Sequence, residues 1–409
     1  MNGKGKIDVV TRIYTFSMLL YVLTVYDVTW LDFLSYSTPI RFYIIIVSIW
    51  KIMTCRNTFP QKYLAPLITL LLYSFYCIFI TLGNFYQTIN YFAFLVSMTS
   101  LIMLDLNEKK YMLRVFINAI VVVLVISLIG WVQYLLGVKL PHTSLIYHRN
   151  EYHEYYDYYL FRVSLHSVLA VFPRFQSIFL EPGQMATPLV FLFYLNTIEN
   201  KVLSFNNIVL LVSILLSFSL IAYGLLLFII FLMIWFKGTK YRFLLLLGVI
   251  AFLFGIVYYY IALEDSALNA LILSRLEYSE EDIITGNNRY SQSFDSMFDS
   301  FMQSSDKYFG IYNKLLSGND WTNGSSGLKK YIVVNGLVGL FLGCLLIFYN
   351  YWINRNKRTL AYLIILTMAF VVRNQLFTPL WFSIAILGFY TLNEIKITKY
   401  GNLKMNNNI

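Results

Sequence analysis

The chain has 409 residues, of which 58% are hydrophobic and only 13% are charged. Soluble globular domains carry about 25% charged residues, so this composition excludes an ordinary water-soluble protein and predicts an integral membrane protein. The apolar runs are long, which excludes a transmembrane β-barrel, because barrel strands alternate in short segments. The three cysteines, Cys55, Cys77 and Cys344, lie in or beside apolar runs, which excludes a disulfide-stapled external domain.

Apolar stretches of about 20 residues predict the transmembrane helices. They lie near residues 13–33, 38–54, 64–83, 87–106, 112–137, 183–199, 242–262, 329–353, 359–376 and 380–395. The remaining apolar stretch, 206–236, is too long for one ordinary span and short for two. We expect it to fold back near Ser217, Ser219 and Gly224, because only then do most basic residues fall on one side, as the positive-inside rule requires.

This topology predicts an all-α polytopic membrane protein with about twelve transmembrane helices, both termini in the cytoplasm and two large external loops that contain short helices. The net charge of +10 is then a topology signal, and we expect no nucleic-acid partner. The expected parts are helices 1–5 in residues 1–137, a first loop in 138–182, helices 6–9 in 183–262, a second loop in 263–328, helices 10–12 in 329–395, and a cytoplasmic tail in 396–409.

The first external loop contains all four histidines of the chain, His142, His148, His153 and His166, together with many tyrosines. No two histidines have the i, i+4 spacing of a dedicated metal motif, so we expect no metal site. Two interpretations of this composition are open. It suits a polar aromatic surface that binds sugars, and it also suits an aromatic belt at the membrane interface. We include His166 and Arg162 among the expected substrate-binding residues.

The end of this loop leads directly into a predicted helix. Pro182 suits the first helical turn, where a missing N–H costs nothing, so Glu181 is expected near the N-cap, at the positive end of the helix dipole. One interpretation of Glu181 is structural, as a cap or as a partner of Arg174. The other interpretation is a carboxylate held at the outer membrane surface and available as a base.

The second loop contains an expected amphipathic helix from Arg289 to Ser304, in which Phe294, Met297, Phe298 and Phe301 recur at helical spacing. This apolar stripe indicates packing against the membrane domain. Arg289 is unusual, because a cation in the first turn opposes the helix dipole by about 0.3 to 1 kcal/mol. The arrangement becomes favourable if the guanidinium and the helix N-terminus both face a phosphate.

Two more polar residues are expected to bind substrate. Arg373 falls inside the predicted span 359–376, about 21 Å from its inner end at 1.5 Å per residue, where a charge is costly. It is expected either to face a wet cavity beside Asn374 and Gln375 or to extend to the membrane surface. Tyr223 lies in the stretch that is expected to fold back.

Several common catalytic motifs are missing, namely the phosphate-binding P-loop, the Rossmann glycine fingerprint, the G-x-S-x-G elbow and the H-E-x-x-H zinc motif. The run RFQSIFLEPGQMA at 174–186 instead resembles the R-x-x-G-x-F-x-E-P-x-x-x-A run of the O-antigen polymerase family, with Ser177 at the usual glycine. The segments 217–219 and 335–339 and Arg289 extend the resemblance. No histidine follows His166, which favours a polymerase over the related O-antigen ligases.

The resemblance implies a GT-C-like fold and a glycosyltransferase of the bacterial inner membrane without cofactor or metal. Donor and acceptor would both be glycans on undecaprenyl pyrophosphate at the periplasmic face, and a chain-length regulator protein is a further partner. Arg174, Glu181 and Arg289 would be catalytic, with the arginines on the leaving pyrophosphate and the carboxylate as base. The alternatives are a lipid-linked oligosaccharide flippase, which the long external loops disfavour, an O-antigen ligase, and a structural subunit.

Overall fold

The computed structural model describes residues 7–23, 37–55, 61–142, 147–148, 154–159, 161–164, 173–200, 202–235, 292–311, 327–373 and 375–405. The chain divides into two compact units. The first unit comprises residues 1–120 and 292–409, and the second comprises residues 121–291, so the boundary falls within one long helix.

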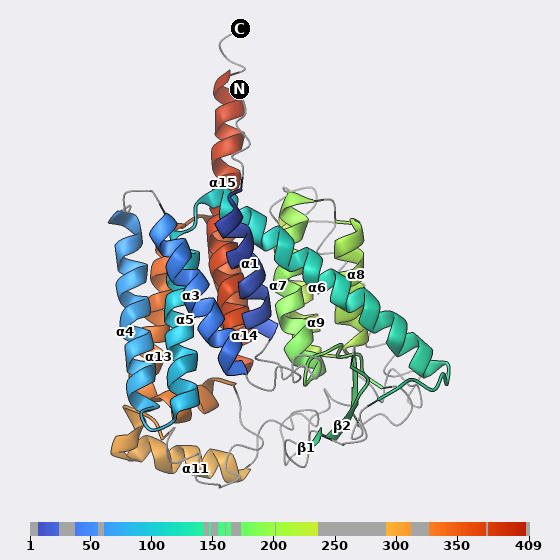
Figure 1. Cartoon of the computed structure of the whole chain (residues 1–409), viewed down its shortest axis with the longest axis horizontal. Helices are drawn as coiled ribbons and strands as arrows, with labels where there is room; N and C mark the ends of the chain where they lie inside the picture. The colour runs from blue at the N-terminus through green and yellow to red at the C-terminus, as the bar shows by residue number, and fades with distance from the viewer. Residues whose placement is uncertain are drawn as a thin grey trace. The chain divides into compact units, whose positions relative to one another are not determined.

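The first unit is a bundle of helices (Figure 1). In this bundle α3 packs against α1 and α5, α4 packs against α5 and α13, and α14 packs against α13 and α15. Its helices are α1 (Val9–Leu23), α3 (Ser37–Thr54), α4 (Leu64–Ile80), α5 (Phe85–Met103), the first half of α6 (Leu106–Leu135), α11 (Gln292–Gln303), α13 (Gly327–Ile353), α14 (Lys357–Val372) and α15 (Pro379–Met405), with short 3-10 turns at Gln61–Tyr63 and Ser305–Lys307.

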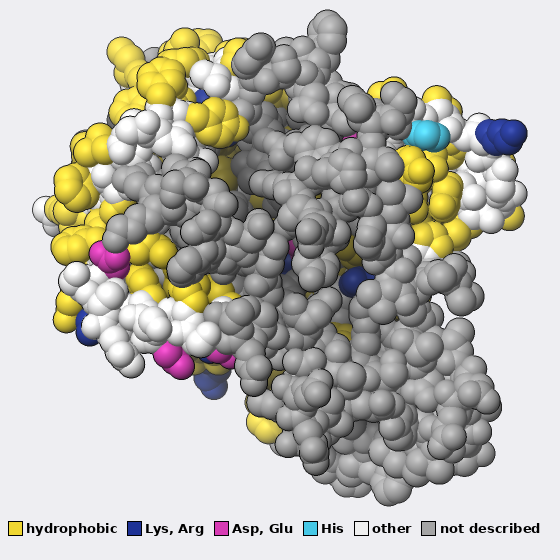
Figure 2. All heavy atoms as spheres, turned by 90° about the horizontal axis from the view of Figure 1, so that it is seen from below, with side chains coloured by type: hydrophobic (Ala, Val, Ile, Leu, Met, Phe, Trp, Pro, Cys, Tyr) yellow, Lys and Arg dark blue, Asp and Glu magenta, His cyan; other side chains and the backbone are white. Residues whose placement is uncertain are grey.

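Helix α4 shows how these helices distribute their side chains. One set of its large apolar residues recurs every three or four positions and is exposed, whereas the opposite face buries both apolar residues, such as Leu70 and Tyr73, and small polar ones, such as Ser74. The exposed set is Leu64, Ile68, Leu71, Leu72, Phe75 and Phe79. Figure 2 likewise shows hydrophobic side chains over much of the described surface on the face it presents. A helix whose exposed face is apolar, with small polar groups buried on the other face, suits lipid rather than water.

Three of the described helical segments are long and apolar enough to cross a membrane: Gln61–Ile80, Leu106–Leu135 and Gly327–Ile353. Shorter apolar helices occupy Val9–Leu23, Phe205–Leu216, Leu220–Trp235 and Pro379–Asn393. The sequence prediction of a helical membrane protein therefore holds. The expected span 242–262 lies outside the described residues. Helix α15 continues to Met405, so the described part of the expected tail is helical.

The second unit contains α7 (Pro182–Glu199), α8 (Phe205–Leu216) and α9 (Leu220–Trp235), with α7 packed against both of the others. The apolar stretch is interrupted at residues 217–219, where a turn was predicted. Phe218 has a left-handed φ of +48°, and the Tyr223 hydroxyl donates a hydrogen bond back to the carbonyl of Leu215. The end of α7 contacts both the start of α8, through Asn196 and Asn207, and the end of α9, through Thr197 and Met233, so the chain folds back here.

A small antiparallel sheet in the first loop is the element that the all-α prediction missed. Its strands are β1 (Tyr147–His148), β2 (Glu154–Asp157) and β3 (Arg162–Ser164), in the order β1-β2-β3. Tyr155 pairs with Tyr147 on one side and with Ser164 on the other. Aromatic residues favour strands, but runs of two to four residues are too short for a period-2 pattern to be visible in the sequence.

Helix α13 is broken at Gly336, which has φ +68° and ψ 176°. The segment after α11 fits into this break, because the Ile311 amide donates to the Val333 carbonyl at 2.9 Å and the Val338 amide donates to the Tyr308 carbonyl at 3.1 Å. A Cβ at Gly336 would lie 2.3 Å from the Tyr308 carbonyl oxygen. Only glycine therefore suits this position, for both its dihedral angle and its space.

The described part of the second loop confirms the expected amphipathic helix as α11 (Gln292–Gln303), and the expected start at Arg289 lies outside the described residues. Phe294 and Phe301 are 2% and 6% exposed and pack with Ile332 and Val333 of α13. The apolar stripe therefore serves packing, as predicted.

Candidate functional site

The N-terminus of α7 has the geometry that the sequence predicts. Glu181 is the N-cap residue, with extended backbone angles of φ −137° and ψ 144°, and Pro182 is the first helical residue. The Glu181 carbonyl accepts hydrogen bonds from the amides of Gln184 and Met185 at 3.0 and 3.2 Å. Its carboxylate makes no capping hydrogen bond to the helix, so the capping interpretation of this side chain is wrong.

The loop that leads to Glu181 is anchored by buried contacts. Ser177 is fully buried, and its hydroxyl lies 2.7 Å from the hydroxyl of Ser127 on α6. Phe175 is also fully buried, and its ring lies 5.6 Å from the ring of Trp131. Ser177 has a left-handed φ of +51°, a region that favours glycine. This backbone conformation explains why a glycine is suited to the position that Ser177 occupies.

Arg174 holds the end of α8. Its Nε donates to the Ser217 carbonyl at 2.9 Å and its Nη2 donates to the Phe218 carbonyl at 3.0 Å. The Phe175 amide donates to the Leu216 carbonyl at 3.0 Å. The last carbonyls of a helix have no partner within it and form the negative end of its dipole, so a guanidinium is a suitable donor at this place.

Arg162, an expected substrate-binding residue, forms a buried ion pair. Its Nε lies 2.9 Å from a carboxylate oxygen of Asp157, and both side chains are less than 5% exposed. Its backbone amide donates to the Ser177 carbonyl at 2.9 Å. Arg162 therefore connects the small sheet to the loop that carries Arg174 and Glu181.

Arg373 does not lie inside a helix, so the predicted span 359–376 is too long at this end. Helix α14 ends at Val372, and Arg373 is its C-cap, 6% exposed, with its amide bonded to the Ala369 carbonyl at 2.8 Å. The backbone at Gly327 lies so close that a Cβ there would come within 2.3 Å of the Arg373 amide nitrogen. A cation at a helix C-terminus complements the dipole, which the apolar pattern alone does not reveal.

The second unit thus places Arg174 and Tyr223 at the end of α8 and Glu181 at the start of α7. Arg373 belongs to the first unit. Arg289 and His166 lie outside the described residues. Within the described ranges, no group of three or more histidine, cysteine or acidic side chains is placed to hold a metal ion.

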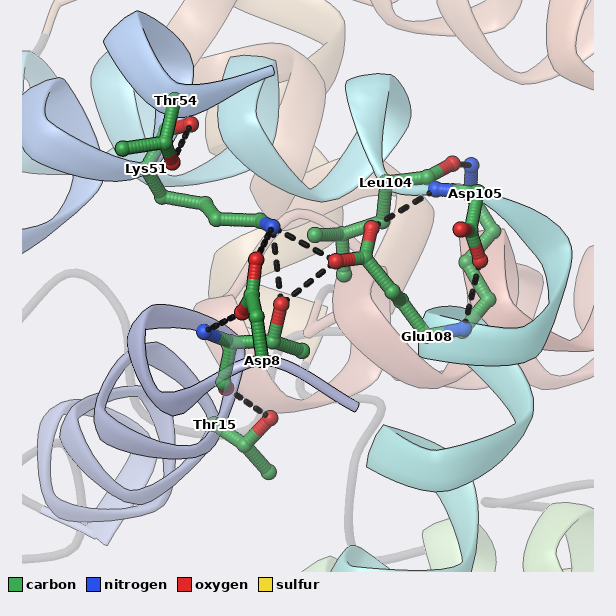
Figure 3. A network of polar contacts seen from close by, with 9 residues as sticks. Asp8, Thr15, Lys51, Thr54, Leu104, Asp105 and Glu108 are labelled. Carbon is green, nitrogen blue, oxygen red and sulfur yellow. Dashed lines mark hydrogen bonds and ion pairs between the residues drawn. The ribbon is translucent and has the colours of Figure 1, made fainter. Parts of the chain in front are cut away.

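Sequence reasoning missed a buried ionic network in the first unit (Figure 3). Lys51 of α3 is 2% exposed, and its ammonium contacts Glu108 at 2.5 Å, the Thr11 hydroxyl at 2.7 Å and Asp8 at 3.5 Å. The Thr11 hydroxyl donates to the same oxygen of Glu108. Two acids, Asp8 just before α1 and Glu108 on α6, therefore face one buried cation. Their separation in sequence leaves no local pattern to predict it.

Comparisons of the chain with protein-family models, with characterised proteins and with solved structures find no match. A function for this chain therefore has to rest on its own residues.

Proposed function

We propose that this protein is an O-antigen polymerase of the bacterial inner membrane, with about twelve transmembrane helices, a GT-C-like arrangement and both termini in the cytoplasm. It would transfer a growing glycan from undecaprenyl pyrophosphate to the non-reducing end of a new lipid-linked repeat unit on the periplasmic face. The helical membrane character and the run at 174–186 support this proposal.

The observation that carries the proposal is the geometry of Glu181. The residue stands at the N-cap of α7, in the electropositive region of the helix dipole, yet its carboxylate is not used to cap the helix. The loop before it is fixed by Phe175 and Ser177, both fully buried. A carboxylate on a fixed loop at a helix start is a suitable general base, because catalysis requires a positioned group.

In the proposed reaction, a hydroxyl of the acceptor sugar attacks the anomeric carbon of the donor. The bond between that carbon and the pyrophosphate oxygen breaks, the pyrophosphate leaves with the electron pair, and the hydroxyl proton passes to Glu181. Arg289 would stabilise the charge that grows on the pyrophosphate. For Arg174 we propose a positioning role, since it donates to the Ser217 and Phe218 carbonyls and so ties the loop to α8.

Deletion of the gene in its native host tests the function. Surface polysaccharide on a gel should lose its ladder and keep a single repeat unit. Complete loss would instead indicate the flippase, and polymer that accumulates on the lipid carrier would indicate a ligase.

Complementation with Glu181→Gln tests the site. We expect loss of the ladder at normal protein abundance, because removal of a general base typically costs about 10²- to 10⁴-fold in rate. Glu199→Gln, the same change at the other end of α7, is the matched control and should restore the ladder. Normal ladders with Glu181→Gln would exclude the base role.

A further inference from the structure

Arg41 is a buried cation to which none of the roles above applies. It is the fifth residue of α3 and is 4% exposed. Its Nη2 donates to the Tyr86 hydroxyl at 2.6 Å, and its Cζ lies 3.8 Å from the centroid of the Tyr86 ring. The other two nitrogens, Nε and Nη1, are buried and have no hydrogen-bond partner in the part of the chain that the structure describes.

Such a guanidinium requires an anion. Arginine cannot relieve its burial by losing a proton, and a neutral ring and hydroxyl offset only part of the cost of desolvating a charge. Nowhere in the described ranges does a carboxylate pair with Arg41. An oxyanion such as phosphate has several acceptor oxygens and satisfies more than one guanidinium nitrogen at once.

The surface beside Arg41 is apolar and aromatic. On α3, Phe42, Tyr43 and Ile46 are 48%, 42% and 66% exposed, and on α5, Phe85 and Tyr86 are 74% and 42% exposed. Exposed aromatic rings near a helix end are typical of the region where lipid headgroups meet the hydrocarbon core. The Tyr86 ring that covers the guanidinium is itself at the surface, so only one side chain separates this part of Arg41 from the surroundings.

We propose that Arg41 binds the phosphate group of a lipid whose hydrocarbon chain lies along the exposed side chains of α3. Phosphodiesters of membrane phospholipids and phosphates of polyprenyl carriers share this chemistry. The inference does not depend on the proposed glycosyl transfer, because it concerns a different residue and makes no statement about reaction.

Native mass spectrometry of the purified full-length protein provides the test. Four probes separate the contribution of the headgroup from that of the tail: phosphatidylglycerol, a polyprenyl phosphate, diacylglycerol, which lacks phosphate, and inorganic phosphate, which lacks a tail.

Arg41→Gln should weaken binding of at least one phosphate-bearing lipid by about tenfold or more, and the lipid that responds identifies the source. Diacylglycerol binding should not change. Arg355→Gln is the matched control, because Arg355 also stacks on a ring, 4.6 Å from that of Trp352, but is exposed.

A second measurement keeps the inference testable if Arg41→Gln folds poorly. The melting temperature of the wild-type protein in detergent should rise on addition of the phosphate-bearing lipid, whereas Arg41→Leu should show no such rise. Equal lipid binding in wild type and Arg41→Gln would overturn the proposal, as would equally tight binding of inorganic phosphate alone. Asp27 and Asp32 lie in the sequence between α1 and α3, outside the described residues. The double variant Asp27→Asn, Asp32→Asn provides one more outcome. If it lowers the melting temperature, and Arg41→Gln leaves lipid binding unchanged, an aspartate of the chain is the counter-ion of Arg41 and the proposal is overturned.

Discussion

Helix α3 carries a buried cation near each end, and the two cations differ in the counter-charges around them. Near its C-terminus, Lys51 meets Glu108 at 2.5 Å and Asp8 at 3.5 Å. Near its N-terminus, Arg41 contacts the hydroxyl and ring of Tyr86, and two of its nitrogens have no partner among the described residues. Burial is nearly equal, at 2% for Lys51 and 4% for Arg41.

The difference teaches that burial of a charge can serve two purposes. Where the chain supplies its own counter-charges, the cation joins helices, since Asp8 precedes α1 and Glu108 belongs to α6. Where the described residues supply none, as at Arg41, we propose that the counter-charge is the phosphate of a bound lipid. Substitutions near Lys51 should therefore change the stability of the fold, whereas substitutions at Arg41 should change the binding of an anion.

The largest effect is expected for Glu108→Gln. This change leaves the Lys51 ammonium buried without its closest counter-charge, and breaking a buried ion pair costs about 3 kcal/mol or more. Thermal unfolding of the purified protein in detergent would show a clear drop in melting temperature. The control is Asp295→Asn, which breaks the half-exposed Lys329–Asp295 pair at 2.6 Å and should cost less than about 1 kcal/mol. Equal effects of the two changes would mean that Lys51 is not a structural cation.

Arg174 offers a third case, in which backbone carbonyls satisfy a cation. Arg174→Ala removes the bonds to the Ser217 and Phe218 carbonyls and should destabilise the second unit by about 2 kcal/mol. Arg174→Lys should recover less than about half of this lost stability, because an ammonium lacks the fork geometry of a guanidinium. Two measurements are needed: the melting temperature of each purified variant, and the polysaccharide ladder of cells that express it. Loss of the ladder at unchanged stability would contradict the positioning role and favour direct contact with pyrophosphate.

The smallest effect is expected for Asp8→Asn. Burial acts to raise the pKa of Asp8, but hydrogen bonds from Thr11 and the nearby Lys51 ammonium outweigh it, so the pKa lies below its ordinary value of 3.8. A carboxylate with a lowered pKa stabilises the folded state fully above that ordinary value, and the stabilisation disappears as the pH falls through the folded-state pKa. Because Asp8 is half-exposed, the difference at neutral pH should be about 0.5 kcal/mol.

Thermal unfolding of wild type and Asp8→Asn across pH 3 to 7 measures this effect. The two curves should differ near neutral pH and converge in acid. A difference that grows toward low pH would have the wrong sign and would contradict the pairing of Asp8 with Lys51.

Local patterns predicted much of the fold. The apolar run at 64–83, the amphipathic pattern of α11 and the serines around Phe218 all depend on residues close in sequence. Longer-range features escaped prediction. Arg373 lies beyond the end of α14 because the backbone at Gly327 packs there, and no apolar count records such a contact.

The candidate site was predicted in part for the same reason. Pro182 placed Glu181 at the N-cap, because a proline in the first turn is a local signal. The partners of Arg174 were not predictable, since Ser217 and Phe218 lie more than forty residues later. The conformation of Ser177 also depends on tertiary contacts, among them its hydroxyl contact with Ser127.

The break in α13 has a consequence for how the protein is made. Its amide at Val338 and its carbonyl at Val333 are bonded to Tyr308 and Ile311, and unpaired backbone groups are costly in hydrocarbon. Residues 308–311 are synthesised before α13, so the groups that satisfy the break are already outside the ribosome when α13 enters the membrane. The final shape of α13 therefore depends on docking of the loop that precedes it, and substitutions in residues 308–311 should affect α13 as much as substitutions within it.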